Sequence, residues 1–570
     1  MPAPPFTAQP IPPSSPRQAF GANGPYYHWW IAGTLMLGFT TAGLSVTVVN
    51  LAFPTIMTSL RADLDEMQWM QTGYMIMQAV MMPSVGWLGA RLGNRRLYLL
   101  SLSLFVIGSI LCGFAWDVNS LIVFRLIQAM GSGPLFPITQ TMLFQTFPEE
   151  KRGLAMGVSS LGFSFGPMIG PVLGGYLIEY ANWRSVFYIN VPVGIIGVIL
   201  GYFVLPTPRR QERRRLDVPG MLTMAAFLVS FLLAVSQGRE EGWDSLYIVT
   251  LLGIALVSGV SFVLIELRSP QPFVELRLFR NLRFAMASIV VSLNTICFMA
   301  ANFIITLFLQ IHLDYTPLQA AWIMMPSAIV VGILSVVTGR LSDLVAPNLL
   351  VIFGMGAVAL CMWQHTTITP WSSMAMITFW LTVRGFARAF TIAPLTVVSL
   401  STLSEAEVRM GSGLLSLNRG IASASSVTLA ATMFQHSLAT RTQRLVQDQS
   451  LAPFGSTELL QGFTNTFEYL GDFSQTASIK AMAMLDRLVT FEAALYSYHD
   501  TFLVVGLIAA VGIVPALWMS KRKAAAPQPS PASATHGDRT VHSIRPATLP
   551  ANGTHNGAAT PVAEETRPPR

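Results

Sequence analysis

The stretch GFSFGPMIGPVLGGYL, residues 162–177, contains five glycines, two prolines and no charged side chain. Glycine and proline are the poorest helix formers, yet the stretch lies in an apolar run of roughly 20 residues, long enough to cross the ~30 Å core of a bilayer as a helix. Glycines four residues apart share one helix face and let a second helix approach closely. The prolines remove backbone donors and bend the helix. The stretch therefore predicts a membrane helix with a smooth groove for a neighbour.

Composition extends this prediction to the whole chain. Of 570 residues, 52% are hydrophobic and only 11% are charged, which is typical of an all-α polytopic membrane protein. We expect fourteen transmembrane helices, beginning near Trp29, Gln68, Leu97, Ser120, Gly153, Val186, Val218, Leu246, Arg283, Leu318, Asn348, Ser373, Gly411 and Thr501.

The distribution of Lys and Arg predicts the orientation. If both termini are cytoplasmic, the short cytoplasmic loops hold 16 basic residues and the short external loops hold 3, as the positive-inside rule requires. The long loop 437–500 then lies outside, where its segment DFSQTASIKAMAMLDRLVTFEAAL (472–495) could form an amphipathic helix on the membrane surface. Lipid headgroups account for the net charge of +7, so no nucleic-acid partner is expected.

The two ends of the chain differ from the rest. Residues 1–28 and 521–570 are polar and rich in proline, and we expect both to be disordered cytoplasmic tails. The first tail lacks the features of a cleaved signal peptide. The three cysteines, Cys112, Cys297 and Cys361, fall inside expected spans and indicate packing rather than a disulfide framework or a metal site.

A repeated turn divides the chain into two halves. GWLGARLGNRR (86–96) follows the second span, and GRLSDLVAPN (339–348) follows the tenth. In each, glycine lets two helix ends approach closely. We therefore expect a six-helix bundle over 29–205, a linker over 206–282 with two extra helices, and a second six-helix bundle over 283–520.

These motifs together resemble the fourteen-span drug:proton antiporter family of the major facilitator superfamily, of the EmrB/QacA type. GWLGARLGNRR is similar to the superfamily's loop motif but has Ala90 where many members have Asp. RLIQAMGSG (125–133), NWRSVFYINVPVG (182–194) and FLQIHLDYTPLQAAWIMMP (308–326) are similar to further family motifs, and the opening stretch resembles the antiporter motif of the fifth span. The resemblance covers about residues 29–520.

The resemblance implies a secondary active exporter of amphiphilic small molecules in the inner cell membrane. It would work by alternating access, be driven by an ion gradient with protons as the expected ion, need no cofactor, and not be an enzyme. In a Gram-negative cell it would also allow a periplasmic adaptor and an outer-membrane channel as partners. The residues that it assigns to conformational motifs are Gly86, Arg91, Gly93, Gly162, Gly166, Pro167, Gly170, Pro171, Gly174 and Asp343.

Arginines inside the expected spans indicate a polar cavity, because an ionisable group at bilayer depth costs at least ~2.5 kcal/mol. Arg384 and Arg388 lie four residues apart on one helix face, too deep to reach either membrane surface easily. Arg125 is either a cavity residue or one that snorkels to the interface. Uncharged partners for a cargo are offered by Asn50, Gln128, Asn294 and Asn302.

The acidic residues are unusual. The resembled family carries an Asp in its first span where this chain has Ser45, and we find no Asp or Glu in the middle of any expected span. Arginines without central acids favour an anionic or zwitterionic amphiphile over the cationic drugs typical of the family. An exporter or flippase of an anionic lipid is therefore an alternative, and a non-transporting receptor or scaffold on the same fold is another.

The sequence leaves open which residue carries the coupling ion. His312 and Asp314, at the outer end of the ninth span, are the candidate proton-coupling residues, because histidine titrates near neutral pH. The competing interpretation is that both only contact headgroups.

Overall fold

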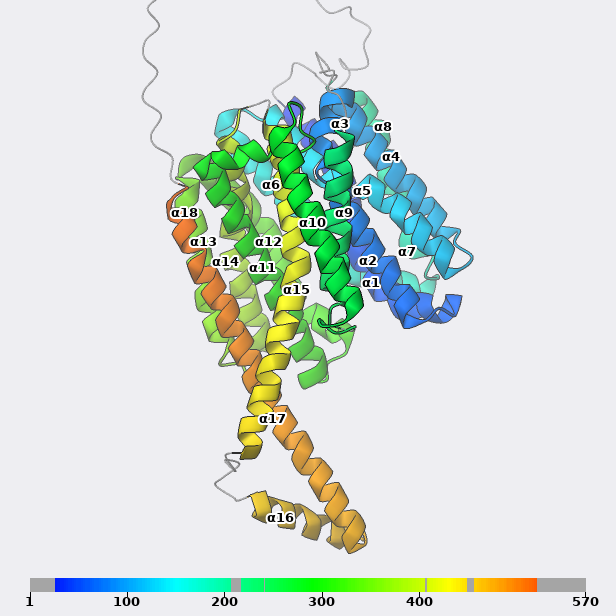
Figure 1. Ribbon diagram of the computed structural model, residues 1–570, viewed down its shortest axis with the longest axis vertical. Helices are drawn as coiled ribbons and strands as arrows, with labels where there is room; N and C mark the ends of the chain where they lie inside the picture. Colours follow the sequence, from blue (N-terminus) through cyan, green and yellow to red (C-terminus); the bar gives the residue numbers. More distant parts are fainter. Residues whose placement is uncertain (1–25, 207–216, 240, 405–406, 448–455, 520–570) are drawn as a thin grey trace, which may run out of the picture. The chain divides into compact units, whose positions relative to one another are not determined.

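The computed structural model describes residues 26–206, 217–239, 241–404, 407–447 and 456–519, and every regular element in these ranges is helical. Figure 1 shows long helices lying side by side, as expected for a chain whose apolar runs must satisfy their backbone hydrogen bonds internally in lipid. The all-helical prediction is confirmed for this part of the chain.

Twelve helical segments in the described ranges are long and apolar enough to cross a membrane. They contain α1 (Tyr27–Leu60), α4 (Asn94–Gly113), α5 (Val118–Thr146), η2 (Glu149–Lys151) with α6 (Arg152–Tyr180), α7 (Ser185–Tyr188) with α8 (Asn190–Val204), α9 (Val218–Gln237), α10 (Leu246–Arg268), α11 (Leu282–Leu307) with η4 (Phe308–His312), α12 (Pro317–Leu344), α13 (Pro347–His365), α14 (Met374–Ser401), and α17 (Ser474–Val511) with α18 (Ile513–Leu517). A short helix, η3 (Leu276–Arg280), precedes α11.

Two of the fourteen expected spans are absent from these twelve. The second corresponds to α2 (Leu64–Met81) and α3 (Ser84–Leu92), which are separate helices on either side of Met82 and Pro83. The thirteenth corresponds to α15 (Val408–Gln447), a 40-residue helix whose polar side chains lower its hydropathy. Both lie inside the helical assembly, since α2 packs on α5 and α15 packs on α11 and α17.

For description we divide most of the helices into two sets, which are joined by an extensive contact between α6 and α12. In the first set, which we call the N bundle, α1 packs on α6 and α8, and α4 packs on α5. In the second, the C bundle, α14 packs on α12 and α13, and α11 packs on α15. The pair α9 and α10 lies against both, because α9 contacts α2 and α15.

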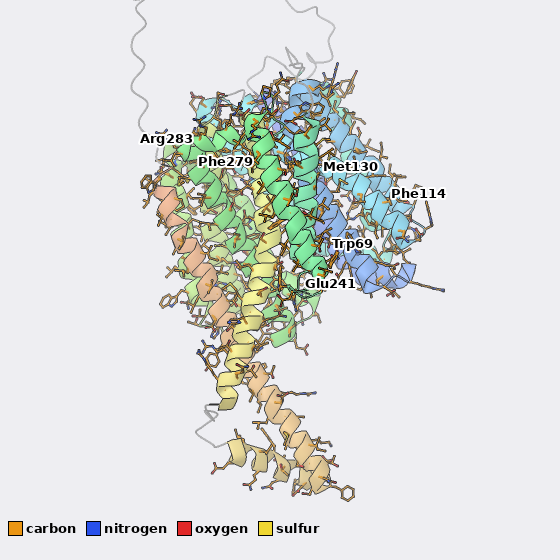
Figure 2. All side chains as sticks on the ribbon, in the orientation of Figure 1. Trp69, Phe114, Met130, Glu241, Phe279 and Arg283 are labelled. Carbon is orange, nitrogen blue, oxygen red and sulfur yellow. The ribbon has the colours of Figure 1, made fainter. Side chains whose placement is uncertain are left out.

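The two ends of the bundles differ in charge and in shape. The end that carries α3 and the start of α11, which we call the basic end, includes Arg283, whereas Glu241 lies toward the opposite end (Figure 2). Apolar side chains such as Phe114 and Met130 are exposed on the flanks of the bundles, where a lipid solvent would cover them.

A helical arm extends from the opposite end, which we call the arm end (Figure 1). The arm consists of the last turns of α15, α16 (Ser456–Tyr469) and the first half of α17. At its base Arg441 donates two hydrogen bonds to the Asp500 carboxylate, at 3.0 and 2.8 Å, and these bonds raise the pKa of Arg441.

The arm corrects one expectation about the long loop. Residues 474–495 do not form a separate surface helix but continue without a break into the last spanning segment. The physical reason is that no proline or glycine interrupts the stretch between Ser474 and Tyr498, so nothing ends the helix where the apolar run begins.

Candidate functional site

Two arginines of α14 form the core of the candidate site. Arg384 is buried and donates a hydrogen bond of 2.7 Å from Nη2 to Asn302 Oδ1 on α11. Arg388, one turn further along α14, places its guanidinium carbon 2.8 Å from the ring centroid of Phe298. Phe298 and Asn302 are themselves four residues apart on α11, so one face of each helix supplies one half of the contact.

Asn294 continues the same face of α11 by one more turn. Its side-chain amide donates to Thr391 Oγ1 at 3.0 Å and contacts Met355 Sδ at 3.4 Å. Three residues at four-residue spacing on α11 therefore face three positions on α14. This places Asn294 beside the arginine pair, but its bonds hold α11 against α13 and α14.

The arginine pair carries positive charge without a paired acid. No carboxylate forms a salt bridge with Arg384 or Arg388 in the part of the chain that the structure describes. Nη1 of Arg384 and Nε of Arg388 are buried without a hydrogen-bond partner. Buried charges are normally paired, so these two guanidinium groups have hydrogen-bond donors left for an anionic partner.

Arg125 forms a second and separate cluster inside the N bundle. Its side chain is fully buried, which rules out the snorkelling interpretation. Nη1 donates to Gln128 Oε1 at 2.7 Å and to Ser45 Oγ at 3.3 Å. The guanidinium carbon lies 4.3 Å from the ring centroid of Tyr74 and 5.6 Å from that of Phe187. Arg125 and Gln128, both expected in the cargo cavity, thus contact each other in a cluster that belongs to one bundle, and their role in cargo binding stays a prediction.

Other expected site residues lie elsewhere or are outside the described side chains. The side chains of Asn50, Pro167 and Pro171 are not among those described. His312 stacks on Phe491 of α17, with ring centroids 3.9 Å apart and planes at 13°. Asp314 is exposed and adopts φ of 55°, a turn conformation that aspartate tolerates. No hydrogen bond joins His312 to Asp314 among the described residues, and coupling through them stays a prediction.

Asp343 joins the two bundles at the basic end. Its carboxylate, at the end of α12, accepts hydrogen bonds from the backbone N–H groups of Gly153 (2.6 Å) and Leu154 (3.0 Å) in the first turn of α6. A carboxylate at this position satisfies free N–H groups and interacts favourably with the helix dipole. Beside it, a Cβ on Gly339 would lie 2.9 Å from Gly157 Cα, so only glycine allows this backbone approach.

The second joint uses the matching turn of the N bundle. Gly86 packs against the side chain of Met410 on α15, and Arg409 Nε donates to Asn94 Oδ1 at 2.9 Å. Gly93 has φ of 82°, which favours glycine. Arg91 is exposed, and its guanidinium lies 5.3 Å from the ring centroid of Trp87.

The glycine stripe of α6 packs against a different helix from the one that contacts the first turn of α6. Gly162, Gly166 and Gly170 face α1 of the same bundle, and a Cβ on Gly166 would lie 2.6 Å from the carbonyl carbon of Gly43. Gly174 is buried further along. α6 also packs on α12 of the other bundle, and this contact includes Gly153, Gly157, Leu161 and Ser164 rather than the glycine stripe.

Near the middle of the helices, Arg419 reaches from one bundle to the other. It donates to Thr396 Oγ1 on α14 at 2.9 Å and to Gln140 Oε1 on α5 at 3.5 Å. Its guanidinium lies 5.6 Å from the ring centroid of Phe136. Sequence reasoning missed the aromatic cluster of Phe39, Phe136 and Phe163, because aromatics at helical spacing are too common in such spans to be a signal.

All hydrogen bonds between the two bundles in the described ranges lie in the basic half or near the middle of the helices. They include a bond of 2.5 Å between the hydroxyls of Thr141 and Ser412. The structure is therefore closed at the basic end.

Comparison with known proteins identifies the family. A profile of the Major Facilitator Superfamily matches residues 35–427. The multidrug export protein EmrB of Escherichia coli (strain K12) is 30% identical over 465 residues, which cover 80% of this chain and 89% of EmrB. The fatty acid resistance protein FarB of Neisseria gonorrhoeae is 27% identical over 499 residues, covering 86% of this chain and 96% of FarB. The structure of the human organic anion transporter MFSD10 (TETRAN) has the same fold, with a TM-score of 0.55 at 12% identity over 85% of this chain and 99% of that one. The chain thus belongs to the Major Facilitator Superfamily, a family of transporters and not of enzymes.

Proposed function

We propose that this protein is a proton-coupled exporter of amphiphilic small molecules, of the multidrug-efflux kind, that prefers cargo with a negative charge. The observation that carries the charge preference is the pair of Arg384, which is buried, and Arg388, which is half-buried one turn further along α14, with no paired acid in the described ranges. An arginine side chain offers several N–H donors to a carboxylate, sulfonate or phosphate group. The apolar part of the cargo would contact rings such as Phe298.

The relatives support this proposal in two respects. EmrB is named for multidrug export and FarB for resistance to fatty acids, which are amphiphiles with one carboxylate. In a Gram-negative cell, a periplasmic adaptor and an outer-membrane channel are the candidate partners of an exporter of this kind. The arm is the part of the chain that would lie nearest to them.

The proposal includes a topology of fourteen spans in the inner cell membrane with the basic end in the cytoplasm. In this topology, α2 with α3 and α15 supply the two spans beyond the twelve apolar ones. Leu344, 78% exposed at the basic end, and Ile479, 69% exposed on the arm, form a matched pair for testing it. In sealed cells an impermeant thiol reagent should label Ile479→Cys and spare Leu344→Cys. The reverse pattern would contradict the orientation.

Binding to the purified protein in neutral-lipid nanodiscs tests the charge preference. Three ligands with one alkyl chain, decanesulfonate, decanol and decyltrimethylammonium, differ mainly in charge. We expect the sulfonate to bind most tightly, and Arg388→Gln to weaken its binding at least about tenfold while changing that of decanol little, because the loss of one charged hydrogen-bonding partner costs roughly 1.5–3 kcal/mol. Asp314→Asn, which changes an exposed charge at the arm end, is the control.

The same experiment separates the lipid alternative. If the natural cargo is an anionic lipid, phosphatidylglycerol added to the nanodiscs should compete with the sulfonate for Arg388. Tighter binding of the quaternary ammonium than of the sulfonate would overturn the proposed preference altogether.

A further inference from the structure

The guanidinium of Arg125 has one buried edge without a hydrogen-bond partner. Of the guanidinium nitrogens, Nη1 donates to Gln128 and Ser45, whereas Nε and Nη2 are buried and without a hydrogen-bond partner. Nε and Nη2 lie on the same edge of the planar group. Two adjacent N–H donors on one edge are the arrangement that binds an anion with two hydrogen bonds.

The surroundings do not neutralise this charge. No salt bridge to Arg125 is present among the described residues. The ring of Tyr74 covers the guanidinium, but its hydroxyl donates to Ser132 Oγ at 2.9 Å and offers no anionic partner. Gln128 is committed as well, since its amide donates to Ser109 Oγ at 2.6 Å. A fully buried cation is thus left with aromatic and neutral partners, which compensate a charge less well than an anion does.

The enclosure limits the size of a ligand. Ser45, Gln128 and Arg125 have no exposed surface, and Tyr74 is 1% exposed. An amphiphile of the size proposed for the site on α14 does not fit such surroundings, whereas an ion of a few atoms requires only local adjustment. The Ser45 hydroxyl accepts from Arg125 Nη1, which is not part of the Nε and Nη2 edge, so this bond leaves the donors of that edge available to a ligand.

We propose that the N bundle binds one small monovalent anion, a halide or a small carboxylate, on the Nε and Nη2 edge of Arg125. The anion stabilises the packing of α5 against α1 and α2 and takes no part in cargo recognition. This inference does not rest on the export function proposed above.

Thermal melting of the purified full-length protein tests the site. At constant ionic strength, gluconate is replaced by chloride in one series and by formate in another. We expect the melting temperature of the wild type to rise and to saturate with at least one of the two, because an ion that binds only the folded protein stabilises it by mass action. A response to chloride indicates a halide site, and a response to formate alone indicates a carboxylate site. No shift with either anion overturns the proposal.

Ser45→Asp is the decisive variant, because it places a carboxylate next to Nη1 and supplies the anion from within. Its melting temperature in gluconate should equal or exceed that of the anion-saturated wild type, and the response to chloride and formate should disappear. Ser45→Asn, of similar size but uncharged, should keep the response. Arg384→Gln should keep it too, because Arg384 belongs to the other bundle. A response that survives in Ser45→Asp places the effect elsewhere on the protein and overturns the proposal.

A second readout does not depend on how the variants fold. If chloride stabilises the wild type, crystals of the wild type are soaked with bromide or iodide. An anomalous peak is then expected within hydrogen-bond reach of Arg125 Nε and Nη2. If chloride stabilises the wild type and no such peak appears, the assigned location is wrong.

Discussion

The two joints at the basic end start from the same sequence spacing and end in different chemistry. Gly339 and Asp343 lie four residues apart at the end of α12, and Gly86 and Ala90 have the same spacing in α3. At the first joint, backbone meets backbone and a carboxylate caps α6. At the second, Gly86 meets the flexible side chain of Met410 and no acid stands at position 90.

This difference indicates how the closed end is held. Charged hydrogen bonds to a helix start have a defined geometry and are lost together when the helices separate. A methionine contact adapts to small shifts. The joint between α12 and α6 should therefore act as the lock of the closed state, and the joint between α3 and α15 should follow its movement.

The largest expected effect comes from adding bulk to the two matching glycines. Gly339→Val should lower transport at least about tenfold, because its side chain would collide with the backbone of α6, which cannot move aside without opening the joint. Gly86→Val should lower it by less than about threefold, because Met410 can change rotamer. Transport rates at equal amounts of protein in the membrane provide the measurement. Equal losses in both variants would mean that the joints are equivalent.

A smaller effect is expected when only the charge of the lock is removed. Asp343→Asn keeps the shape but weakens both bonds to α6, at a cost of about 1–2 kcal/mol. The ratio of closed to open molecules should fall roughly 5- to 30-fold. Spin labels on Lys151 and Leu349, in a background without the three native cysteines, would report this as a larger long-distance population. An unchanged distance distribution would show that Asp343 is not the lock.

The smallest effect tests the weaker joint by restoring an acid. Ala90→Asp places a carboxylate close to the start of α15 and to Arg409, which should stabilise the closed state by about 0.3–1 kcal/mol. The same pair of labels should show a modest gain of the short distance. Asp343→Asn is expected to lower the closed population and Ala90→Asp to raise it. The closed population of the double variant should therefore lie between those of the two single variants. A shift toward open molecules in Ala90→Asp would refute the symmetry argument.

The sequence predicted best what depends on one helix alone. Apolar length indicated the spans, and four-residue spacing correctly placed Arg384 and Arg388 on one face. The sequence was less informative about which helices, far apart along the chain, pack against each other. The stripe of Gly162, Gly166 and Gly170 signalled close packing, but only the three-dimensional structure shows that α1 is the partner.

The same limit applies to polar contacts between the bundles. Asp343 is 190 residues away from Gly153 along the chain. The sequence around Asp343 does not indicate that α6 is the helix that it caps. The span expected near Gly411 corresponds to α15, which is less apolar than the other spans because some of its polar side chains bond to other helices rather than to water. Neither the bonds of Asp343 to α6 nor the polar bonds of α15 to other helices produce a periodic pattern in the sequence.

One transport measurement tests the central claim, export of negatively charged amphiphiles, most directly. Proteoliposomes containing the wild type or Arg388→Gln are given a pH gradient and two fluorescent amphiphiles of permanent charge, an alkyl sulfonate and a quaternary alkylammonium. Neither crosses the bilayer readily by itself, because its charge cannot be neutralised by protonation. The account predicts that the wild type moves the sulfonate faster than the ammonium, and that Arg388→Gln slows the sulfonate alone. Faster movement of the ammonium, with both cargoes slowed equally in Arg388→Gln, would contradict it.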